Sequence, residues 1–462
     1  MICLLHAWLL EGSGSNLWTR SIITALAKRG ETVHLVCQEN HPDRYEAIGE
    51  AYRHKLSGAV EQTFKRDTPF SGNCILHQPE IGSTLPVFVR DKYEEFENVV
   101  PMMELNDADI ELYIERNVAV VRRIVADNDI TAIHANHAVL MPVVAQRVSR
   151  ETGIPFTIMP HGSDIEYAVK KDERFKHYAS SALVDCARVF TIGKEMRDRM
   201  TTVFSELPNI QSKFVELHLG VDTSQFDPLS HEKRAQEIAL LEKALDGSPR
   251  AAVGEYESKL PDADLEEKLR KVKWIDDPVL LFTGRLISAK GIQHVVEAMP
   301  KLLEEVPDLR LIIVGHGPLR GPLQSRIREL VIPEDKVIFT GYLTHRELRF
   351  LFPCCDVGVF PSMVREAGPL VFLESLASGC FPLGTYFAGM AASIDAVTKD
   401  LPPEVGETMK LGVETTTEDL VRQVPRALRI APQYKEELAR IAREHYDWVS
   451  VARTFRSELD SL

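Results

Sequence analysis

The sequence predicts an α/β protein with two Rossmann-like domains that face each other across a cleft and are joined by a charged helical segment. Three observations predict this fold. Short apolar runs alternate with stretches of helical periodicity in both halves of the chain, which is typical of parallel strands covered by helices. The 462 residues are too many for one ordinary core. Polar clusters come directly after the apolar runs, where parallel sheets place their binding loops.

The first half, residues 1–228, is expected to form one of the two domains. An apolar run at 2–8, a glycine-rich turn and a helical pattern at 16–29 predict the start of a βαβ unit. The irregular stretch at 41–101 is expected to hold a polar helix at 43–53 and to bind an acceptor. Further strands are expected at 32–37, 74–77, 85–89, 131–135, 155–159, 188–192 and 214–217, and further helices at 107–128, after Asn136 and at 194–203.

A second domain is expected at 278–440, after a charged segment at 229–277 that is low in β-branched residues. The charge pattern and helical periodicity of that segment favour a solvated helical hairpin, with a partner-binding arm as the alternative. The second domain repeats the strand–loop–helix order of the first. Its strands are expected at 279–283, 311–314, 337–340, 357–360 and 381–383, and its helices at 291–305, after Pro318, at 345–352, from Pro369 to Gly379 and from 418 onward.

Composition argues against several classes of function. The formal net charge of −14 argues against a nucleic-acid-binding protein and against steady adhesion to anionic lipid. The seven cysteines are scattered without a paired motif, which favours buried free thiols in a reducing cytoplasm over disulfides or zinc. The apolar start lacks a basic leader region, and no later run reaches the length of a membrane span. We therefore expect a cytoplasmic protein with small-molecule partners, and homo-oligomerisation is left open.

Two glutamates in the stretch 357–379 are the strongest candidates for a binding site. The stretch is expected to form a buried strand, a polar loop that holds Glu366, and a helix that begins near Pro369 and holds Glu374. The N–H groups at the start of such a helix attract a phosphate. We expect a nucleotide-sugar site in which one carboxylate binds sugar hydroxyls and the other binds a ribose. The alternative is that both glutamates only complement the helix dipole.

The loop after the strand at 279–283 carries two cations, Arg285 and Lys290. Two cations on one short loop are suited to bind a diphosphate and to neutralise a leaving nucleotide without a metal ion. The alternative is a solvated basic turn. No acidic metal-binding motif lies nearby in the sequence, so we expect that no metal is required. Gly12 and Gly14, before the first helix, are expected to let the backbone approach an anion, with a capped tight turn as the alternative.

Loops after other strands supply further candidates. Gly315, Gly341 and Tyr342 are expected to border a flat base, although turn chemistry explains them nearly as well. His161, in the sequence PHGSD, is expected to bond a sugar hydroxyl or to stabilise charge, with a structural histidine as the alternative. A metal pair of histidines is disfavoured because no third ligand is evident. The residues expected on the acceptor side are His134, His137 and Asp164.

Taken together, these motifs resemble family four of the retaining glycosyltransferases, part of glycosyltransferase group 1, which have the GT-B architecture. In the second half the resemblance is carried by GRLISAKG, VGHGP, FTGY and PSMVREAGPLVFLESLASG, and in the first half by EGSGSN, PHGSD and HLGVDTSQFDP. It implies that the second domain binds the donor and that the last helix, within 441–462, returns to the first domain. The sequence departs from the family at the first glycine loop and at Leu219, where asparagine is usual.

The resemblance implies a retaining, metal-independent transfer of a sugar from a UDP-, GDP- or ADP-sugar to an unknown acceptor, with no further cofactor. It implies that Arg285 and Lys290 bind the diphosphate, Glu374 the ribose and Glu366 the donor sugar, with His161 at the reacting face. Front-face attack through an oxocarbenium-like state is implied, with the departing phosphate as base. The catalytic set is therefore His161, Glu366, Arg285 and Lys290. The donor-binding set is Gly12, Gly14, Gly284, Arg285, Lys290, Gly315, Gly341, Tyr342, Glu366, Ala367, Gly368, Pro369, Leu370 and Glu374.

Other hypotheses stay open from the sequence. One is a related GT-B enzyme, either a phosphorylase or a sugar-nucleotide epimerase. Another is a catalytically silent sugar-nucleotide binder that acts through partners of the segment 229–277. A nicotinamide oxidoreductase is disfavoured, because the glycine spacing of its fingerprint is absent from the sequence.

Overall fold

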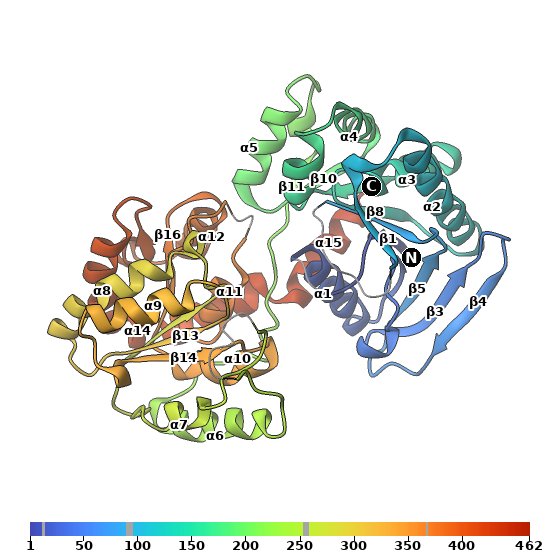
Figure 1. The fold of residues 1–462 in the computed structure, drawn as a ribbon. Helices are drawn as coiled ribbons and strands as arrows, with labels where there is room; N and C mark the ends of the chain where they lie inside the picture. Colours follow the sequence, from blue (N-terminus) through green and yellow to red (C-terminus); the bar gives the residue numbers. More distant parts are fainter. Residues whose placement is uncertain (12–13, 89–95, 253–257, 366–367) are drawn as a thin grey trace. The chain divides into compact units, whose positions relative to one another are not determined.

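The computed structural model describes residues 1–11, 14–88, 96–252, 258–365 and 368–462, which form two compact units. Unit 1 comprises Met1–Gly220 and Trp448–Leu462, and unit 2 comprises Val221–Asp447 (Figure 1). Each unit is built around one large, mainly parallel β-sheet with helices packed against it. The predicted α/β class is therefore confirmed.

The sheet of unit 1 has nine strands in the order β11-β10-β9-β8-β1-β2-β5-β3-β4. The central strand β1 (Ile2–Leu5) pairs in parallel with β2 (Thr32–Val36) and β8 (Ala132–Asn136). Strands covered on both faces are mostly apolar, which is why these runs could be recognised in the sequence despite polar residues such as His34 and His134. The other strands are β3 (Ile48–His54), β4 (Val60–Lys65), β5 (Asn73–Pro79), β9 (Phe156–Met159), β10 (Arg188–Thr191) and β11 (Phe214–Glu216), and a separate pair is formed by β6 (Thr84–Val87) and β7 (Asn98–Pro101).

Helix α15 (Trp448–Asp460), from the far end of the chain, completes unit 1 by packing on α1 (Gly14–Lys28). The ring of Phe455 lies edge-on to that of Trp18 with 5.8 Å between their centroids. An ion pair between Arg188 and Glu458 ties the same helix to β10. The remaining α-helices described in unit 1 are α2 (Asp107–Asp127), α3 (Met141–Thr152), α4 (Glu173–Asp185) and α5 (Gly193–Val203).

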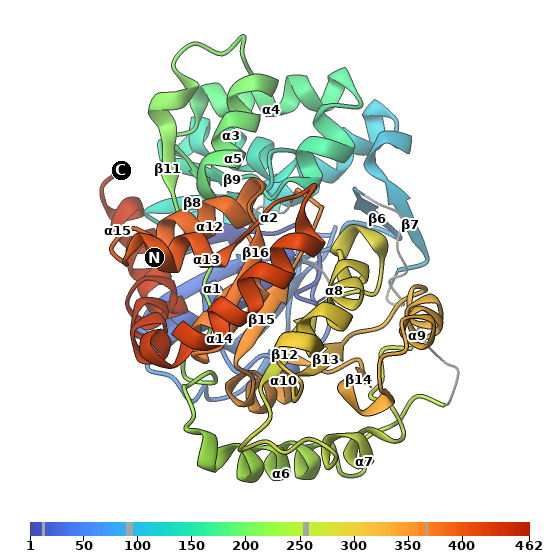
Figure 2. The same ribbon diagram turned by 90° about the vertical axis from the view of Figure 1, so that its left-hand side faces the viewer.

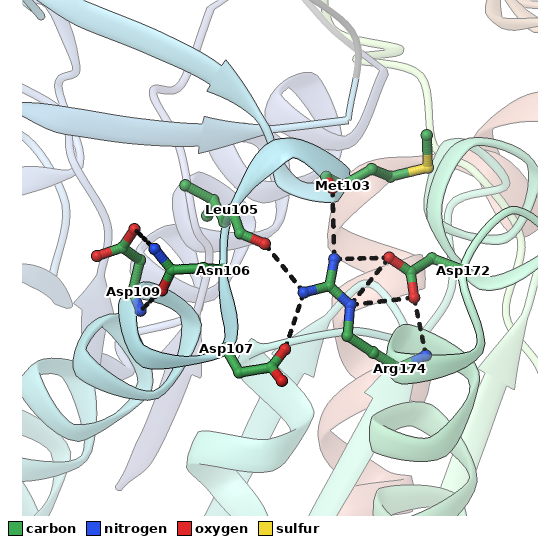
Figure 3. Close-up of polar contacts among 7 residues, drawn as sticks. All are labelled: Met103, Leu105, Asn106, Asp107, Asp109, Asp172 and Arg174. Carbon is green, nitrogen blue, oxygen red and sulfur yellow. Dashed lines mark hydrogen bonds and ion pairs between the residues drawn. The ribbon is translucent and has the colours of Figure 1, made fainter.

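Arg174 links the first turns of α2 and α4 (Figure 3). Its guanidinium donates to the carbonyl of Leu105 at 3.0 Å and to the carboxylates of Asp107 at 2.8 Å and Asp172 at 2.7 Å. Asp172 is also the N-cap of α4, where it accepts from the backbone N–H of Arg174 at 2.9 Å. Asn106 caps α2 by accepting from the backbone N–H of Asp109. Two capped helix starts, distant in sequence, are thereby held by one side chain.

The sheet of unit 2 has six parallel strands in the order β14-β13-β12-β15-β16-β17. The strand order reverses at β12 (Val279–Thr283), which lies between β13 (Arg310–Val314) and β15 (Val357–Phe360). Such a switch point opens the carboxyl edge of the sheet to a ligand. The other strands are β14 (Val337–Gly341), β16 (Phe381–Thr385) and β17 (Lys410–Leu411). The helices on this sheet are α8 (Ile292–Glu305), α9 (Arg320–Glu329), α10 (His345–Leu351), α11 (Leu370–Ala377), α12 (Ala388–Thr398), α13 (Pro403–Met409) and α14 (Thr416–Ile441).

The expectation of a solvated helical hairpin at 229–277 is wrong. The helices α6 (Arg234–Leu245) and α7 (Leu265–Leu269) belong to unit 2, and Figure 2 shows them below α10. Four leucines of these helices are buried, Leu241, Leu245, Leu265 and Leu269, and the guanidinium of Arg234 is buried against Asp356 at 2.5 Å. The segment appeared solvated because its charges are numerous, but these leucines are covered, whereas Leu240 stays exposed.

The polar helix expected at 43–53 is also wrong. The structure has a single 3-10 turn at Pro42–Arg44 and then the strand β3. β3 pairs with β5 on one side and β4 on the other, and the backbone N–H of Gly49 donates to Asn73 Oδ1 at 2.9 Å. Tertiary pairing thus overrides a helical pattern of charges.

The seven cysteines are all buried free thiols, as the sequence predicted. No helix within the described ranges combines the length and apolar character needed to cross a bilayer.

Candidate functional site

Glycine-rich loops meet at the carboxyl edge of the unit 2 sheet. The backbone N–H of Gly284 donates to Val314 O at 3.0 Å, and that of Gly315 donates to Gly341 O at 2.8 Å. Gly315 has φ +141°, and a Cβ built on it would overlap the carbonyl oxygen of Gly284. The close approach of these backbones therefore requires glycine, and it joins the loops after β12, β13 and β14 into one surface.

Arg285 and Lys290 lie on the first of these loops. Arg285 is exposed and Lys290 is partly exposed, so both cations are accessible at the carboxyl edge. Between them Leu286 is fully buried, and its backbone N–H donates to His316 O at 2.8 Å. The loop is also tied to the one after β15 by a bond from the N–H of Met363 to the carbonyl of Ala289. The two predicted phosphate ligands are thus held on a braced loop.

Glu374 lies in the second turn of α11 and is only 4% exposed. Its Oε1 lies 2.6 Å from Nδ1 of His345, the first residue of α10. Its Oε2 is buried and has no hydrogen-bond partner among the residues that the structure describes. Sequence reasoning missed His345, because only the fold brings the starts of α10 and α11 together.

The other predicted residues of this region are distributed as follows. Helix α11 begins at Leu370, one residue after Pro369. Gly379 lies just beyond its end in the left-handed conformation, with φ +68°. Tyr342 is partly exposed, and its ring lies edge-on to that of His316, in the predicted loop after β13, with 5.4 Å between centroids. Gly368 and Leu370 lie at the start of α11, and Gly14 is the first residue of α1. Three predicted residues lie outside the described ranges: Gly12, Glu366 and Ala367.

A second cluster of polar side chains lies at the carboxyl ends of β1, β8 and β9 in unit 1. His161 Nε2 is 2.8 Å from Asn136 Oδ1, and the rings of His161 and His137 are 4.8 Å apart. Asp164 is fully buried and accepts from the backbone N–H of Ala138 at 2.6 Å. His137 has φ +68°, a conformation that is strained for a residue other than glycine. The fold thus brings three predicted residues together: His137, His161 and Asp164.

His6 joins this cluster although the sequence analysis did not single it out. Its Nε2 lies 3.0 Å from Asn16 Oδ1, and its ring is stacked on that of His137. A polar residue directly after an apolar strand was the signal that could have identified it. His134, by contrast, points into the core, where its Nδ1 lies 2.8 Å from Thr157 Oγ1 and its ring contacts Phe455. This contact pattern is that of a structural histidine.

Burial determines the protonation of the unit 1 cluster. It lowers the pKa of His6 to about 4 and that of His161 to about 3, and it lowers the pKa of His137 well below its ordinary value. Burial raises the pKa of Asp164 to about 6 despite the backbone N–H groups that face it. At neutral pH the rings are therefore uncharged and can act as hydrogen-bond donors or acceptors.

Comparison with known proteins finds a family match within the second unit. Residues 265–399 match the family model described as "Glycosyl transferases group 1". A 2-deoxystreptamine glucosyltransferase of Streptomyces kanamyceticus is 27% identical over 180 residues, which is 38% of this chain and 46% of that protein. A GDP-mannose-dependent phosphatidylinositol monomannoside mannosyltransferase of Mycolicibacterium smegmatis is 34% identical over 126 residues, 26% of this chain and 33% of that protein. The chain thus matches less than half the length of these relatives.

Solved structures match over the whole chain. Sucrose-phosphate synthase from Thermosynechococcus elongatus aligns with TM-score 0.61 and 16% identity, covering 100% of this chain and 99% of that one. Anabaena HepE in complex with UDP aligns with TM-score 0.61 and 14% identity, covering 100% of both chains. At such identities the likeness concerns the fold alone. The chain therefore has the GT-B fold of these glycosyltransferases, with two Rossmann-like domains, and its second unit carries the match to group 1.

Proposed function

We propose that the protein is a glycosyltransferase that moves a sugar from a nucleoside-diphosphate sugar to an acceptor hydroxyl. One observation carries the proposal: the carboxyl edge of the unit 2 sheet combines accessible cations, closely packed glycine backbones and a buried carboxylate, Glu374, within the segment that matches group 1. Structural neighbours include proteins solved with UDP, UDP-glucose or ADP, which supports a donor of this chemistry.

Each side chain has a separate task in this proposal. Arg285 and Lys290 bind the diphosphate, and their charge stabilises it as it leaves. Glu374 accepts hydrogen bonds from the ribose. Glu366, outside the described residues, binds hydroxyls of the donor sugar. Because two cations on this loop can neutralise the leaving group, the proposed reaction needs no metal ion.

The proposed chemistry keeps the anomeric configuration. The bond from the anomeric carbon to the diphosphate oxygen breaks as the acceptor hydroxyl attacks from the same face. Its proton passes to the departing phosphate. His161, neutral at physiological pH because burial lowers its pKa to about 3, serves as a hydrogen-bonding group rather than as a fixed charge. The Asn136 contact at 2.8 Å orients its ring.

Two of the relatives suggest the classes of acceptor to test. The relatives include a 2-deoxystreptamine glucosyltransferase and a phosphatidylinositol monomannoside mannosyltransferase, so a small polar alcohol and a lipid headgroup are both to be screened. The pair His137 and Asp164, beside His161, is the proposed acceptor side of unit 1.

A ligand panel tests the donor site. Thermal stability is measured with UDP, GDP, ADP, dTDP and inorganic phosphate, each with and without EDTA. A ligand that binds only the folded protein stabilises it by about 2.7 kcal/mol at a hundredfold excess over its Kd. We expect one nucleoside diphosphate to stabilise the wild type, with no effect of EDTA, and to have little effect on the double variant R285A/K290A.

The matched control removes two exposed cations from elsewhere in unit 2, Lys301 and Arg328. The variant K301A/R328A should respond like the wild type. No stabilisation by any diphosphate would refute the donor site. Phosphate-dependent turnover without a nucleotide would favour a phosphorylase, and donor binding with neither hydrolysis nor transfer would favour a silent binder. Proton NMR of the first product formed would show whether the configuration is retained.

A further inference from the structure

The contact between His345 and Glu374 is not explained by the roles assigned so far. His345 opens α10, where the capping box of Thr344 and Glu347 fixes the start of the helix. Its Nδ1 lies 2.6 Å from Glu374 Oε1 on α11. The two helices follow β14 and β15, so the contact lies at the same edge of the sheet as the glycine loops.

The burial of Glu374 makes this contact consequential. The side chain of Glu374 is 6% exposed and that of His345 is 51% exposed, so a buried carboxylate is paired with a histidine that reaches the surface. A buried carboxylate is costly unless both oxygens accept hydrogen bonds. His345 satisfies Oε1, whereas Oε2 has no partner among the described residues. The carboxylate is therefore held in place by one oxygen, while the other is left for a donor that the described part of the chain does not provide.

We infer that His345 is a positioning residue of the nucleotide site, which fixes Glu374 so that its Oε2 accepts from the ribose hydroxyls of the donor. This inference rests on the proposed function. A neutral imidazole with its proton on Nδ1 and an imidazolium both donate to Oε1, so either form can hold the carboxylate. The diol of a ribonucleoside supplies the O–H donors that Oε2 lacks.

Two amide substitutions distinguish a positioning contact from general damage. The side-chain nitrogen of asparagine can take the place of Nδ1, whereas that of glutamine corresponds to Nε2. H345N should therefore keep the bond to Glu374, while H345Q and H345A should lose it. The exposed neighbour Arg346 provides the control R346A, which removes a cation from the same turn of α10.

The experiment compares Kd by calorimetry for two probes: the nucleoside diphosphate that stabilises the wild type, and its 2′,3′-dideoxy analogue. We expect H345A and H345Q to bind the ribonucleotide about tenfold more weakly, as for the loss of one hydrogen bond to a charged group. Binding of the dideoxy analogue should be unchanged in every variant, and H345N and R346A should match the wild type for both probes. In turnover, KM for the donor should rise by about the same factor in H345A, with kcat unchanged.

The outcomes separate the inference from the proposed function. Wild-type protein that binds no nucleoside diphosphate refutes both. Ribonucleotide binding that depends on Arg285 and Lys290 but not on His345 supports the proposed function and overturns the inference. Tighter binding by H345A also overturns it, since His345 would then obstruct the site. Equal weakening for both probes would show a structural role and not a ribose-linked one.

Discussion

Gly315 shows how a single residue can fix the geometry of the proposed nucleotide site. It has φ +141°, and a Cβ would collide with the backbone of Gly284. The loops after β12 and β13 can therefore approach one another only because this residue has no side chain. Since Arg285 directly follows Gly284, a shift of either loop would move the proposed phosphate ligand.

We expect G315A to lower the free energy of unfolding by more than about 3 kcal/mol, because the collision involves rigid backbone as well as an unfavourable φ. Urea denaturation measures the change. The control is G153A, whose residue ends α3 with φ +76° and has open space around the position of a Cβ. That variant should lose only about 1 kcal/mol. Equal losses would mean that backbone conformation alone, and not the approach of the loops, accounts for the requirement.

At the scale of elements, Arg174 joins two helices whose starts are far apart in sequence. Its bonds to Leu105 O and to the N-cap Asp172 hold the beginning of α2 beside that of α4 (Figure 3). Both helices pack against α3, which follows β8 and the loop of His137, so the contact stabilises this group of helices.

We expect R174A to lower the free energy of unfolding by about 1–2 kcal/mol, because the carbonyl of Leu105 and the N-cap Asp172 lose a charged donor that is only partly exposed. Chemical denaturation measures the loss. D107A removes a partner whose side chain is 79% exposed, so it should change stability by less than about 0.5 kcal/mol. If D107A costs as much as R174A, the exposed ion pair and not the bridge between the helices is the stabilising contact.

Element by element, the sequence was informative where a strand is buried on both faces and uninformative where tertiary pairing decides. The runs at β1, β12 and β15 are apolar apart from the terminal Thr283, and the structure has strands there. β3 reads IGEAYRH, and its charged residues predict a polar helix. The segment forms a strand because it pairs with β4 and β5, and this pairing cannot be seen in the local sequence. Likewise α6 and α7 were expected in solvent, since nothing local shows which side of a charged helix is covered.

The same distinction applies to the candidate site. The glycine loops, Arg285, Lys290 and Glu374 follow strands in the sequence, and position after a strand is a local signal. His345 and His6 can be recognised as site residues only from their contacts with Glu374 and Asn16, which the local sequence does not show. His134 shared the local signal with His137, but the fold turns its side chain into the core.

At the scale of the molecule, unit 1 contains an unusual number of uncharged buried histidines. Three of them, on β2, β5 and β3, form a chain in which His34 Nδ1 lies 3.0 Å from His77 Nε2 and His77 Nδ1 lies 2.9 Å from His54 Nε2. Burial lowers the pKa of His77 to about 2 and that of His54 to about 4. Together with the histidines of the candidate site, they belong to a set of described residues of unit 1 whose pKa is lowered. The set is His6, His34, His54, His77, His134, His137 and His161.

We therefore expect unit 1 to lose stability in mild acid. The unfolded pKa of a histidine is about 6.5, and burial places the folded pKa of these residues below it. The free energy of unfolding is therefore not reduced by them above about pH 6.5, and it falls as the pH decreases toward the folded pKa. Each such group contributes up to about 1.4 kcal/mol per pH unit in that window. Hydrogen exchange at pH 7 and pH 5, corrected for intrinsic rates, should show protection lost mainly in unit 1.

Two variants calibrate this prediction. H134F keeps an aromatic ring among Trp18, Phe190 and Phe455 but cannot be protonated, so the loss of protection on acidification should be smaller. H177Q changes an exposed histidine of α4 and should leave the pH dependence as in the wild type. Equal loss of protection in both units would show that buried histidines do not govern the acid response.

The return of α15 to unit 1 has a consequence for biosynthesis. The chain leaves unit 1 after Gly220 and re-enters it at Trp448, and a Cβ on Gly220 would collide with the indole of Trp448. All of unit 2 therefore leaves the ribosome before the helix that covers Trp18 becomes available. Domains that fold as units during synthesis usually finish in chain order. Here the order is reversed: unit 2 can be complete while unit 1, which began first, still exposes the apolar face of α1.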